Sequence, residues 1–170
     1  MRIFTKKTMM HRLFFILALL TVYACNGQNK NAIKKTMEDT IKTIQRSEEE
    51  WKKILTPEQY HVLREKGTDR PFSGKYYLTQ DKGIYKCAAC GSELFTSDMK
   101  FNSECGWPSF DKEIAGGKII KQVDRSFGMV RTEILCAKCG SHLGHLFDDG
   151  PTSTGLRYCV NSTSIDFKKK

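Results

Sequence analysis

Seven cysteines are the residues best able to do chemistry in this 170-residue chain, and four of them form a near repeat. Cys87-Ala-Ala-Cys90 and Cys136-Ala-Lys-Cys139 are each followed by Gly-Ser, and the glycine can take the left-handed conformation that a metal knuckle needs. Two such turns can deliver four thiolates to one tetrahedral Zn²⁺, and four protein ligands predict a structural metal rather than a catalytic one. Two disulfides or a redox dithiol are the alternatives, although a thioredoxin-type Cys-x-x-Cys opens a helix, whereas these glycines favour turns.

Two further cysteines, Cys105 and Cys159, have no place in this repeat, which suggests either redox chemistry or a structural disulfide between them. Cys105 lies in a segment typical of a loop. Cys159 lies in a segment typical of a strand, where alternation places Arg157, Cys159 and Asn161 on one face. Because a nearby cation favours the reactive thiolate, we predict that Cys159 is a nucleophile and that Cys105 is its partner.

Two histidines, His142 and His145, follow the second knuckle directly, so a bound metal would fix where they point. They could be metal ligands or ordinary surface imidazoles, but the four cysteines already complete a ligand set. We therefore predict that both are proton-transfer groups. His61 has no such neighbours and is predicted to be a surface residue.

The elements that position these groups are two short helices and a body of strands. Ser47 with Glu50, and Thr56 with Gln59, form capping boxes that predict two consecutive helices, the second of which ends at Gly67. After residue 71 the apolar pattern changes to a period of two residues. The chain is therefore predicted to be mainly β, with helices only at its front.

Individual strands are indicated by short alternating segments. Residues 75–79 and 84–87 flank a turn signal at 80–83 and predict a β-hairpin. Further alternating apolar positions predict strands around residues 130–136, 157–161 and 165–167. The last but one of these strands carries the predicted nucleophile.

The first 24 residues have the pattern of an export signal. Basic residues up to Arg12 precede the apolar run Leu13–Leu20, which is too short to span a bilayer as a mature helix. Val22-Tyr23-Ala24-Cys25 resembles a bacterial lipoprotein cleavage box, with simple cleavage or an uncleaved anchor as alternatives.

This leader predicts an organisation in three parts: a signal peptide over residues 1–24, a tether over 25–46 that is lipid-anchored through Cys25, and a globular domain over 47–170. The mature protein is accordingly expected to be exported to the cell envelope as a membrane-anchored lipoprotein. We expect it to be a monomer.

The charge balance argues against a nucleic-acid partner. The chain has 28 Lys plus Arg against 19 Asp plus Glu, for a formal charge of +9. Four of these basic residues lie in the leader and three at the extreme C-terminus, which leaves +2 for the body. A nucleic-acid binder would keep its positive charge on a folded face.

Together these segments resemble the peptide-methionine (R)-S-oxide reductase family, MsrB. The resemblance covers about Ser47 to Phe167, nearly the whole predicted domain. Besides the two knuckles, it rests on five separate motifs: Arg70–Gly74, Cys105–Phe110, His142–His145, Asp149–Pro151 and Arg157–Ser162.

The resemblance implies two antiparallel sheets of the Mss4-like, or β-tent, type, with short N-terminal helices and one structural Zn²⁺ away from the chemistry. It implies that Cys159 is the nucleophile, that Cys105 is the resolving cysteine and that Trp107 holds the S-methyl group of the substrate. It also implies that the sulfoxide oxygen is bound and protonated by His142, His145 and Asn161. Arg157 and Asp149 are implied to support the active-site face.

The implied reaction reduces the R epimer of methionine sulfoxide in proteins, which repairs oxidative damage. A sulfoxide sulfur is electrophilic but its oxygen leaves poorly, so the reaction needs a thiolate at sulfur and an acid at oxygen; a positioned acid contributes roughly 10²–10⁴ in rate. Cys159 would become a sulfenic acid, release methionine and condense with Cys105. Thioredoxin or a similar dithiol would then reduce the disulfide.

Two other functions compete with this interpretation. A zinc-knuckle binding module would need the four knuckle cysteines but not Cys159, Asn161 or the paired histidines. A general disulfide exchanger of the envelope would not need Trp107 beside one thiol and two histidines near the other. The joint presence of all these residues favours the reductase.

Overall fold

The computed structural model describes residues 43–170, which form one compact unit. The predicted signal peptide, Cys25 and most of the predicted tether lie outside the described residues. Within residues 43–170, no helix has the length and apolar character needed to cross a membrane.

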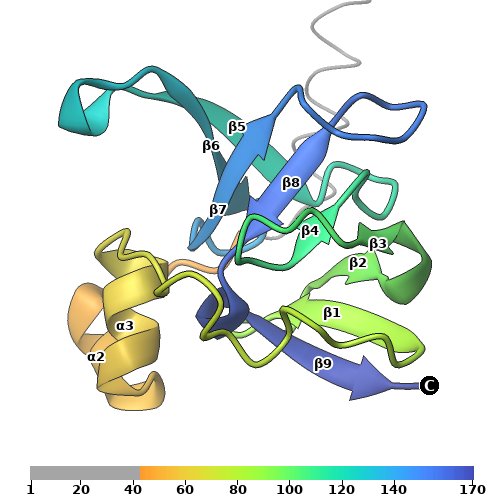
Figure 1. Cartoon of the computed structure of the whole chain (residues 1–170). Coiled ribbons are helices and arrows are strands. Elements are labelled where there is room, and N and C mark those ends of the chain that lie inside the picture. The colour runs from red at the N-terminus through yellow and green to blue at the C-terminus, as the bar shows by residue number, and fades with distance from the viewer. Residues whose placement is uncertain (1–42) are drawn as a thin grey trace, which may run out of the picture. The chain divides into compact units, whose positions relative to one another are not determined.

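Two helices open the described chain, as the capping boxes predict (Figure 1). Helix α2 spans Glu48–Ile54 and helix α3 spans Pro57–Arg64. Both capping boxes are formed, because each cap side chain accepts from the third backbone N–H and the Glu50 or Gln59 side chain accepts in return. Helix α3 packs on the six-stranded sheet through β7.

A sheet of three strands forms one layer of the body. Its order is β2 (Glu93–Thr96), β1 (Gly83–Cys87) and β9 (Ile165–Lys169), and both pairings are antiparallel. The first strand in the sequence, β1, is therefore central, with the last strand of the chain as one neighbour. Its buried positions alternate, as expected for a strand with one face in the core.

A second antiparallel sheet has six strands in the order β3-β4-β8-β7-β6-β5. Their bounds are Lys100–Phe101 for β3, Ser109–Phe110 for β4, Ile119–Asp124 for β5, Arg131–Cys136 for β6, His142–Phe147 for β7 and Arg157–Val160 for β8. Single turns of 3₁₀ helix occur at Ser97–Met99, Ser126–Gly128 and Ser162–Ser164. The prediction of a mainly β fold with two antiparallel sheets is confirmed.

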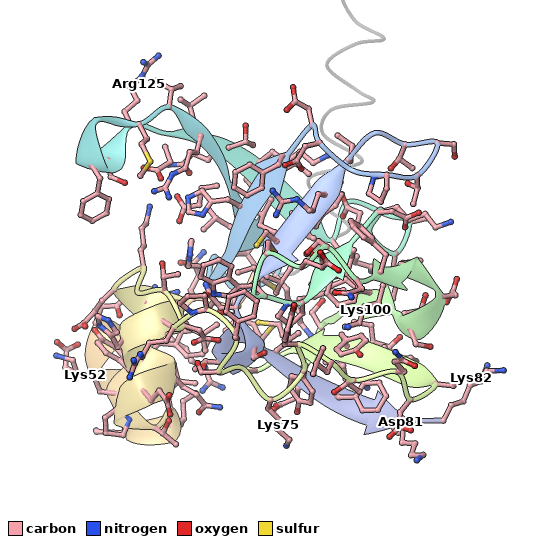
Figure 2. All side chains as sticks on the ribbon, viewed as in Figure 1. Lys52, Lys75, Asp81, Lys82, Lys100 and Arg125 are labelled. Atoms are coloured by element: carbon pink, nitrogen blue, oxygen red, sulfur yellow. The ribbon has the colours of Figure 1, made fainter. Side chains whose placement is uncertain are left out.

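An aromatic cluster joins the two sheets. Phe95 of β2 and Phe110 of β4 stack with their ring centroids 4.2 Å apart, and Tyr85 of β1 meets Phe110 edge-on at 5.0 Å. Tyr158 of β8 packs against Phe95. All four rings are buried, and their contacts link strands of both layers. Charged side chains such as Lys75, Asp81 and Lys82 point outward from this core (Figure 2).

The predicted hairpin over residues 75–87 is wrong. Residues 75–79 form turns, in which Tyr77 donates its N–H to the carbonyl of Gly74 and Tyr76 donates to the Ser162 hydroxyl. Both edges of β1 are already occupied by β2 and β9. A strand at residues 75–79 would therefore find no free edge of β1 with which to pair.

The end of the second helix also differs from the prediction. Helix α3 ends at Arg64, and Lys66 rather than Gly67 takes the left-handed conformation, with φ of 60°. Gly67 instead donates its N–H to the carbonyl of His61, and a side chain there would collide with the His61 ring. Gly67 itself has no positive φ, so the left-handed residue that follows the helix is Lys66.

Candidate active site

Cys105 and Cys159 lie side by side in the six-stranded sheet. Cys105 is in the loop between β3 and β4, and Ser109 of β4 is paired with Cys159 of β8, so the loop returns Cys105 to that strand. The two Sγ atoms are 3.7 Å apart and both residues are free thiols. A small shift would bring the sulfurs to the disulfide bond length of about 2.05 Å.

Hydrogen bonds around Cys105 favour its thiolate. A hydrogen bond from the Cys159 thiol and others from the Ser103 and Ser109 hydroxyls lower the pKa of Cys105 to about 4. The Ser103 hydroxyl is 2.9 Å from the sulfur, and it is also 2.7 Å from the Ser109 hydroxyl. These contacts favour the negative charge on Cys105 and the proton on Cys159.

The neighbours of Cys159 act on its pKa in opposite directions. The hydrogen bond that its thiol gives to Cys105, together with burial, raises the pKa of Cys159, whereas Arg157 lowers it. The neighbouring cation thus acts in the predicted direction but is outweighed while Cys105 is ionised. The Sγ–Sγ contact of 3.7 Å is short enough for a proton to pass from one sulfur to the other.

A small cavity of about 110 Å³ opens on Cys159 but not on Cys105. Trp107 forms part of its wall, and the indole Nε1 donates to the carbonyl of Asp69 at 3.0 Å. Asn161 also reaches the cavity, and its Oδ1 accepts from the Asp69 N–H at 3.0 Å. One backbone unit, at Asp69, therefore fixes both the aromatic wall and the amide.

His145 lies directly across from Cys159. The two residues are paired between β7 and β8, and the neighbouring Gly144 has φ of 151°. A Cβ on Gly144 would overlap the Cys159 carbonyl oxygen, so the glycine allows the two strands to approach closely. His145 lines the same cavity as Cys159.

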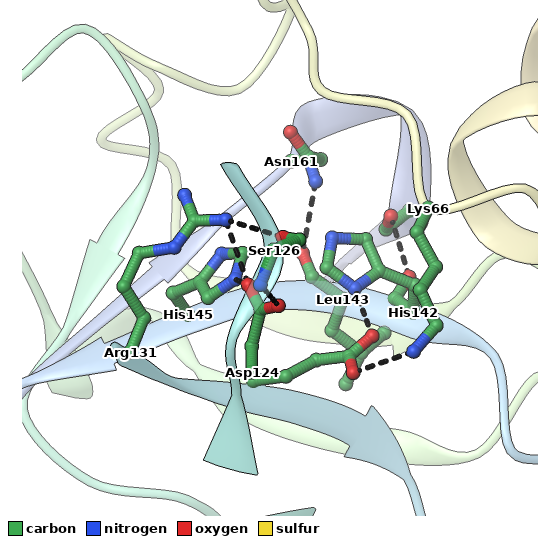
Figure 3. A network of polar contacts seen from close by, with 10 residues as sticks. Lys66, Asp124, Ser126, Arg131, His142, Leu143, His145 and Asn161 are labelled. Carbon is green, nitrogen blue, oxygen red and sulfur yellow. Dashed lines mark hydrogen bonds and ion pairs between the residues drawn. The ribbon is translucent and has the colours of Figure 1, made fainter. Parts of the chain in front are cut away.

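A carboxylate orients His145 (Figure 3). Its Nε2 donates to Asp124 Oδ2 at 2.9 Å, and Arg131 donates to the same oxygen at 2.7 Å. Hydrogen bonds from the Ser126 N–H and hydroxyl, and then from His145, hold the pKa of Asp124 well below its ordinary value. The carboxylate thereby fixes the orientation of the His145 ring toward the cavity.

The second histidine, His142, is buried behind this cavity rather than lining it. Its Nδ1 donates to Glu133 Oε1 at 2.8 Å, and Lys66 binds the other carboxylate oxygen at 2.8 Å (Figure 3). Burial lowers the pKa of His142, although Glu133 opposes that effect. Its Nε2 is buried with no partner among the described residues, and the ring centroid is 5.5 Å from that of His145.

Arg157 and Asp149 form a two-pronged ion pair beside the thiols. Arg157 Nε and one terminal nitrogen donate to the two Asp149 oxygens at 2.7 and 2.8 Å. The Asp149 carboxylate raises the pKa of Arg157, and the guanidinium stacks 4.4 Å from the Phe147 ring centroid. The predicted supporting pair is thus formed in the structure.

The two knuckles bring four sulfurs together. Sγ of Cys87 is 3.7 Å from that of Cys139, Sγ of Cys90 is 3.6 Å from that of Cys136, and all four lie within 4.8 Å of one another. Four thiolates 2.3 Å from a tetrahedral Zn²⁺ would be about 3.8 Å apart. The cluster therefore has a donor set and a size suited to a metal ion.

Both knuckles close in the same way. In each, the glycine after the second cysteine donates its N–H to the backbone carbonyl oxygen of the first cysteine at 2.8 Å, with φ of 71° at Gly91 and 70° at Gly140. The first knuckle follows β1 and the second follows β6, so a metal would tie one sheet to the other. Strand β7 begins at His142, three residues after Cys139.

Comparison with known proteins identifies the family. The model of the SelR domain matches residues 55–169. A protein named peptide methionine sulfoxide reductase MsrB from Methanosarcina barkeri is 60% identical over 127 residues, which cover 75% of this chain and 89% of the relative. Proteins of the same name from Leptospira interrogans and Agrobacterium fabrum are 59% and 53% identical, covering 75% and 76% of this chain and 97% and 96% of their own lengths.

The chain belongs to the MsrB family. The resemblance recognised from the motifs is confirmed, and the protein is an oxidoreductase. This excludes the binding module without catalysis. Residues 55–169 of the family match contain every predicted site residue except Cys25, which lies outside the described structure.

Sequence reasoning missed the carboxylates that hold the two histidines of this MsrB site. Glu133 is 2% exposed in the middle of β6, and Asp124 ends β5, far from His145 in the sequence. The only available signal was the acidic residue Glu133 directly before the apolar Ile134 and Leu135 of β6. Arg131 and Lys66, which bind these carboxylates, gave no signal at all.

We predict that iodoacetamide modifies Cys105 well below neutral pH. Because its pKa is lowered to about 4, the thiolate is present above that pH and is lost only as the pH falls through it. Alkylation rates measured by mass spectrometry should therefore stay near their plateau down to about pH 5. Ser103→Ala should move the midpoint upward, and a wild-type midpoint near the ordinary value of about 8.5 would contradict the prediction.

Proposed function

We propose that this protein reduces the R epimer of methionine sulfoxide in proteins, with Cys159 as nucleophile and Cys105 as resolving cysteine. The observation that carries the proposal is the 3.7 Å contact between two free thiols, of which only Cys159 opens on the cavity walled by Trp107. The names of the relatives support methionine sulfoxide as the substrate. The motifs support the R epimer, through the resemblance that they carry.

The cavity suits the reacting end of a methionine sulfoxide. Its flat aromatic wall, Trp107, is held by Asp69 and offers an apolar face to the S-methyl group. Polar groups for the sulfoxide oxygen come from His145 and Asn161, which line the same cavity. A substrate placed this way presents its sulfur to Cys159.

Protons are supplied by the two histidines, in unequal roles. His145 lines the cavity and is oriented by Asp124, so it is assigned the role of direct acid. His142 is buried behind it, with Glu133 on Nδ1 and an unpartnered Nε2. In the proposal, His142 orients His145 and returns a proton to it.

The reaction balances as follows. The proton of Cys159 passes to Cys105, and the Cys159 thiolate, facing Arg157, attacks the sulfoxide sulfur. With one proton delivered to oxygen, the oxygen passes to Cys159 as a sulfenic acid and methionine is released. Cys105 then attacks the sulfenic sulfur, which forms the disulfide and releases water. Thioredoxin or a similar dithiol supplies two electrons and two protons to restore the thiols.

A metal in the four-cysteine cluster is proposed to be a structural Zn²⁺. The four thiolate donors fit Zn²⁺ and leave it no open position for substrate. The cluster joins the knuckle after β1 to the knuckle after β6. The ion would thereby stabilise the packing of the two sheets and the start of β7.

The cellular location of the protein is proposed from the leader sequence alone. The apolar run Leu13–Leu20 and the box ending at Cys25 support export and lipid anchoring of a monomeric enzyme in the cell envelope. Metabolic labelling with a radioactive lipid precursor tests this. We expect label in the wild type and none in Cys25→Ala; equal labelling of both proteins, or of neither, would disprove lipidation at this residue.

We predict that substitution of Cys159 and substitution of Cys105 have different effects on methionine formation. Cys159→Ser should form methionine from a peptide R-sulfoxide at less than about one-thousandth of the wild-type rate. Cys105→Ser should turn over with dithiothreitol, because the charge that raises the pKa of Cys159 is gone and Arg157 remains. With thioredoxin it should stop after one turnover. Sustained thioredoxin turnover would refute the resolving role, and methionine formation by Cys159→Ser would refute the nucleophile.

We predict that the metal contributes folding energy but takes no part in the reaction. The wild type should bind one equivalent of zinc, and Cys136→Ser should lose it and lower the free energy of unfolding by more than about 3 kcal/mol. Cys105→Ser serves as the matched control, since it removes a thiol outside the cluster and should keep the zinc. Full stability without zinc would show that the cluster has no structural metal.

A further inference from the structure

Glu133 is a buried carboxylate with both of its oxygens occupied. It is 2% exposed in β6, and its two oxygens accept from His142 Nδ1 and from Lys66 Nζ, each at 2.8 Å (Figure 3). Buried ionic groups of this kind are often no more stabilising than well-packed apolar side chains of similar volume. Stability alone therefore does not explain a carboxylate at this position.

Lys66 reaches the carboxylate from an unusual backbone position. It lies just beyond the C-terminal end of α3 with φ of 60°, a left-handed conformation that favours glycine and is strained for a residue with a side chain. Gly67, the next residue, does not take that conformation. A lysine thus occupies the position that suits glycine, and its partly exposed side chain extends from solvent to the buried Glu133.

The two ring nitrogens of His142 have different surroundings. Nδ1 is bonded to Glu133, whereas Nε2 is buried with no partner within residues 43–170. Figure 3 shows the Nε2 edge of the ring on the side where His145 lies, and the two ring centroids are 5.5 Å apart. An ionised carboxylate only accepts hydrogen bonds, so Nδ1 must carry a proton. Nε2 is then the atom at which the ring can gain or lose one.

We infer that Glu133 is a positioning residue for the reduction, because it keeps a proton on His142 Nδ1 and leaves Nε2 as the only atom through which that ring exchanges protons. Lys66 is a second positioning residue, since it keeps Glu133 ionised. The inference rests on the proposed function and adds to it two residues outside the substrate cavity. Neither of them lines that cavity.

The proton transfer balances at one atom. When His145 gives its proton to the sulfoxide oxygen, the His142 imidazolium passes its Nε2 proton to His145 and becomes neutral, with Nδ1–H retained. Because bound substrate fills the cavity, a buried imidazolium supplies this proton without water. After methionine leaves, Nε2 is protonated again through His145, which is open to the cavity. Glu133 stays ionised and stabilises the imidazolium, as the carboxylate of a Ser-His-Asp triad does.

The two partners of this ion pair act on the pKa of His142 in opposite directions. Burial lowers the pKa of His142, Glu133 raises it by its hydrogen bond and its charge, and the positive charge of Lys66 lowers it. Replacing the two partners one at a time should therefore shift the proton affinity of the ring in opposite directions, which a loss of packing would not do. The charged and titratable groups around the ring are Glu133 on β6, His145 on β7 and Lys66 after α3, with Asp124 and Arg131 one contact further away around His145.

The first test measures the single-turnover rate of methionine formation against pH, with the zinc-loaded full chain in excess over a peptide R-sulfoxide. Glu133→Gln removes the charge that raises the pKa of His142, so the alkaline limb of the profile should move to lower pH by at least about half a pH unit. Lys66→Met removes a charge that lowers this pKa, so the same limb should move to higher pH. The enzyme concentration that gives half the maximal rate should change less than about twofold in both variants, because neither residue lines the cavity.

Two variants control for charge and for the loss of a surface ion pair. Lys66→Arg keeps the positive charge and should give the wild-type profile. Lys169→Met removes the lysine of another exposed ion pair, 3.2 Å from Asp81, in the three-stranded sheet, and should also leave the limb in place. Shifts of Glu133→Gln and Lys66→Met in the same direction, no shift in either, or an equal shift in Lys169→Met would overturn the inference.

A second test locates the proton in the wild-type protein without substrate, so it depends on neither activity nor the folding of a variant at Glu133. In a long-range ¹H–¹⁵N spectrum of the full chain labelled with ¹⁵N-histidine, at about pH 8, His142 should show a protonated Nδ1 and an unprotonated Nε2. The signals are assigned by their absence in His142→Asn. A proton on Nε2 with a bare Nδ1 would overturn the inference. Failure of the proposed function would appear separately, as absence of methionine formation by the wild type.

Discussion

The register of one strand, β8, is the constraint on which the site depends. Its pairing with β4 sets Cys159 against Ser109 and so brings in the Cys105 loop, while its pairing with β7 sets Cys159 against His145. A slip of one residue would turn Cys159 toward the aromatic core and Tyr158 toward the cavity. Gly144 allows β7 and β8 to approach each other closely, because a side chain at this position would collide with the backbone of β8.

The carboxylates that contact the two histidines each have more than one hydrogen-bond partner. These partners limit the free-energy cost of burying the negative charge. An isolated buried carboxylate is strongly unfavourable, but Glu133 is bound by Lys66 on one oxygen and by His142 on the other. Asp124 is likewise bound by Arg131, His145 and the Ser126 N–H. Each carboxylate comes from β5 or β6, so the outer strands of the sheet serve to hold imidazoles on β7.

The metal cluster and the aromatic core act on the same interface between the sheets. The Phe95–Phe110 stack joins β2 to β4, whereas the four-cysteine cluster joins the end of β1 to the end of β6. One contact is apolar and the other is a cluster of four thiol groups suited to a metal ion. Because the second knuckle leads directly into β7, a metal there would also fix the start of the strand that carries both histidines.

The sequence by itself determined the family, the two capped helices, the knuckle cysteines and the thiol pair, because each depends on residue types at short, fixed spacings. It did not determine that residues 75–79 lack a strand partner, since that depends on β9 occupying the edge of β1 from the other end of the chain. Nor did it reveal Glu133 and Asp124 as the partners of the two histidines. These follow from distances between segments that only the folded sheets bring together, and a buried carboxylate acquires its role only from the neighbours that neutralise it.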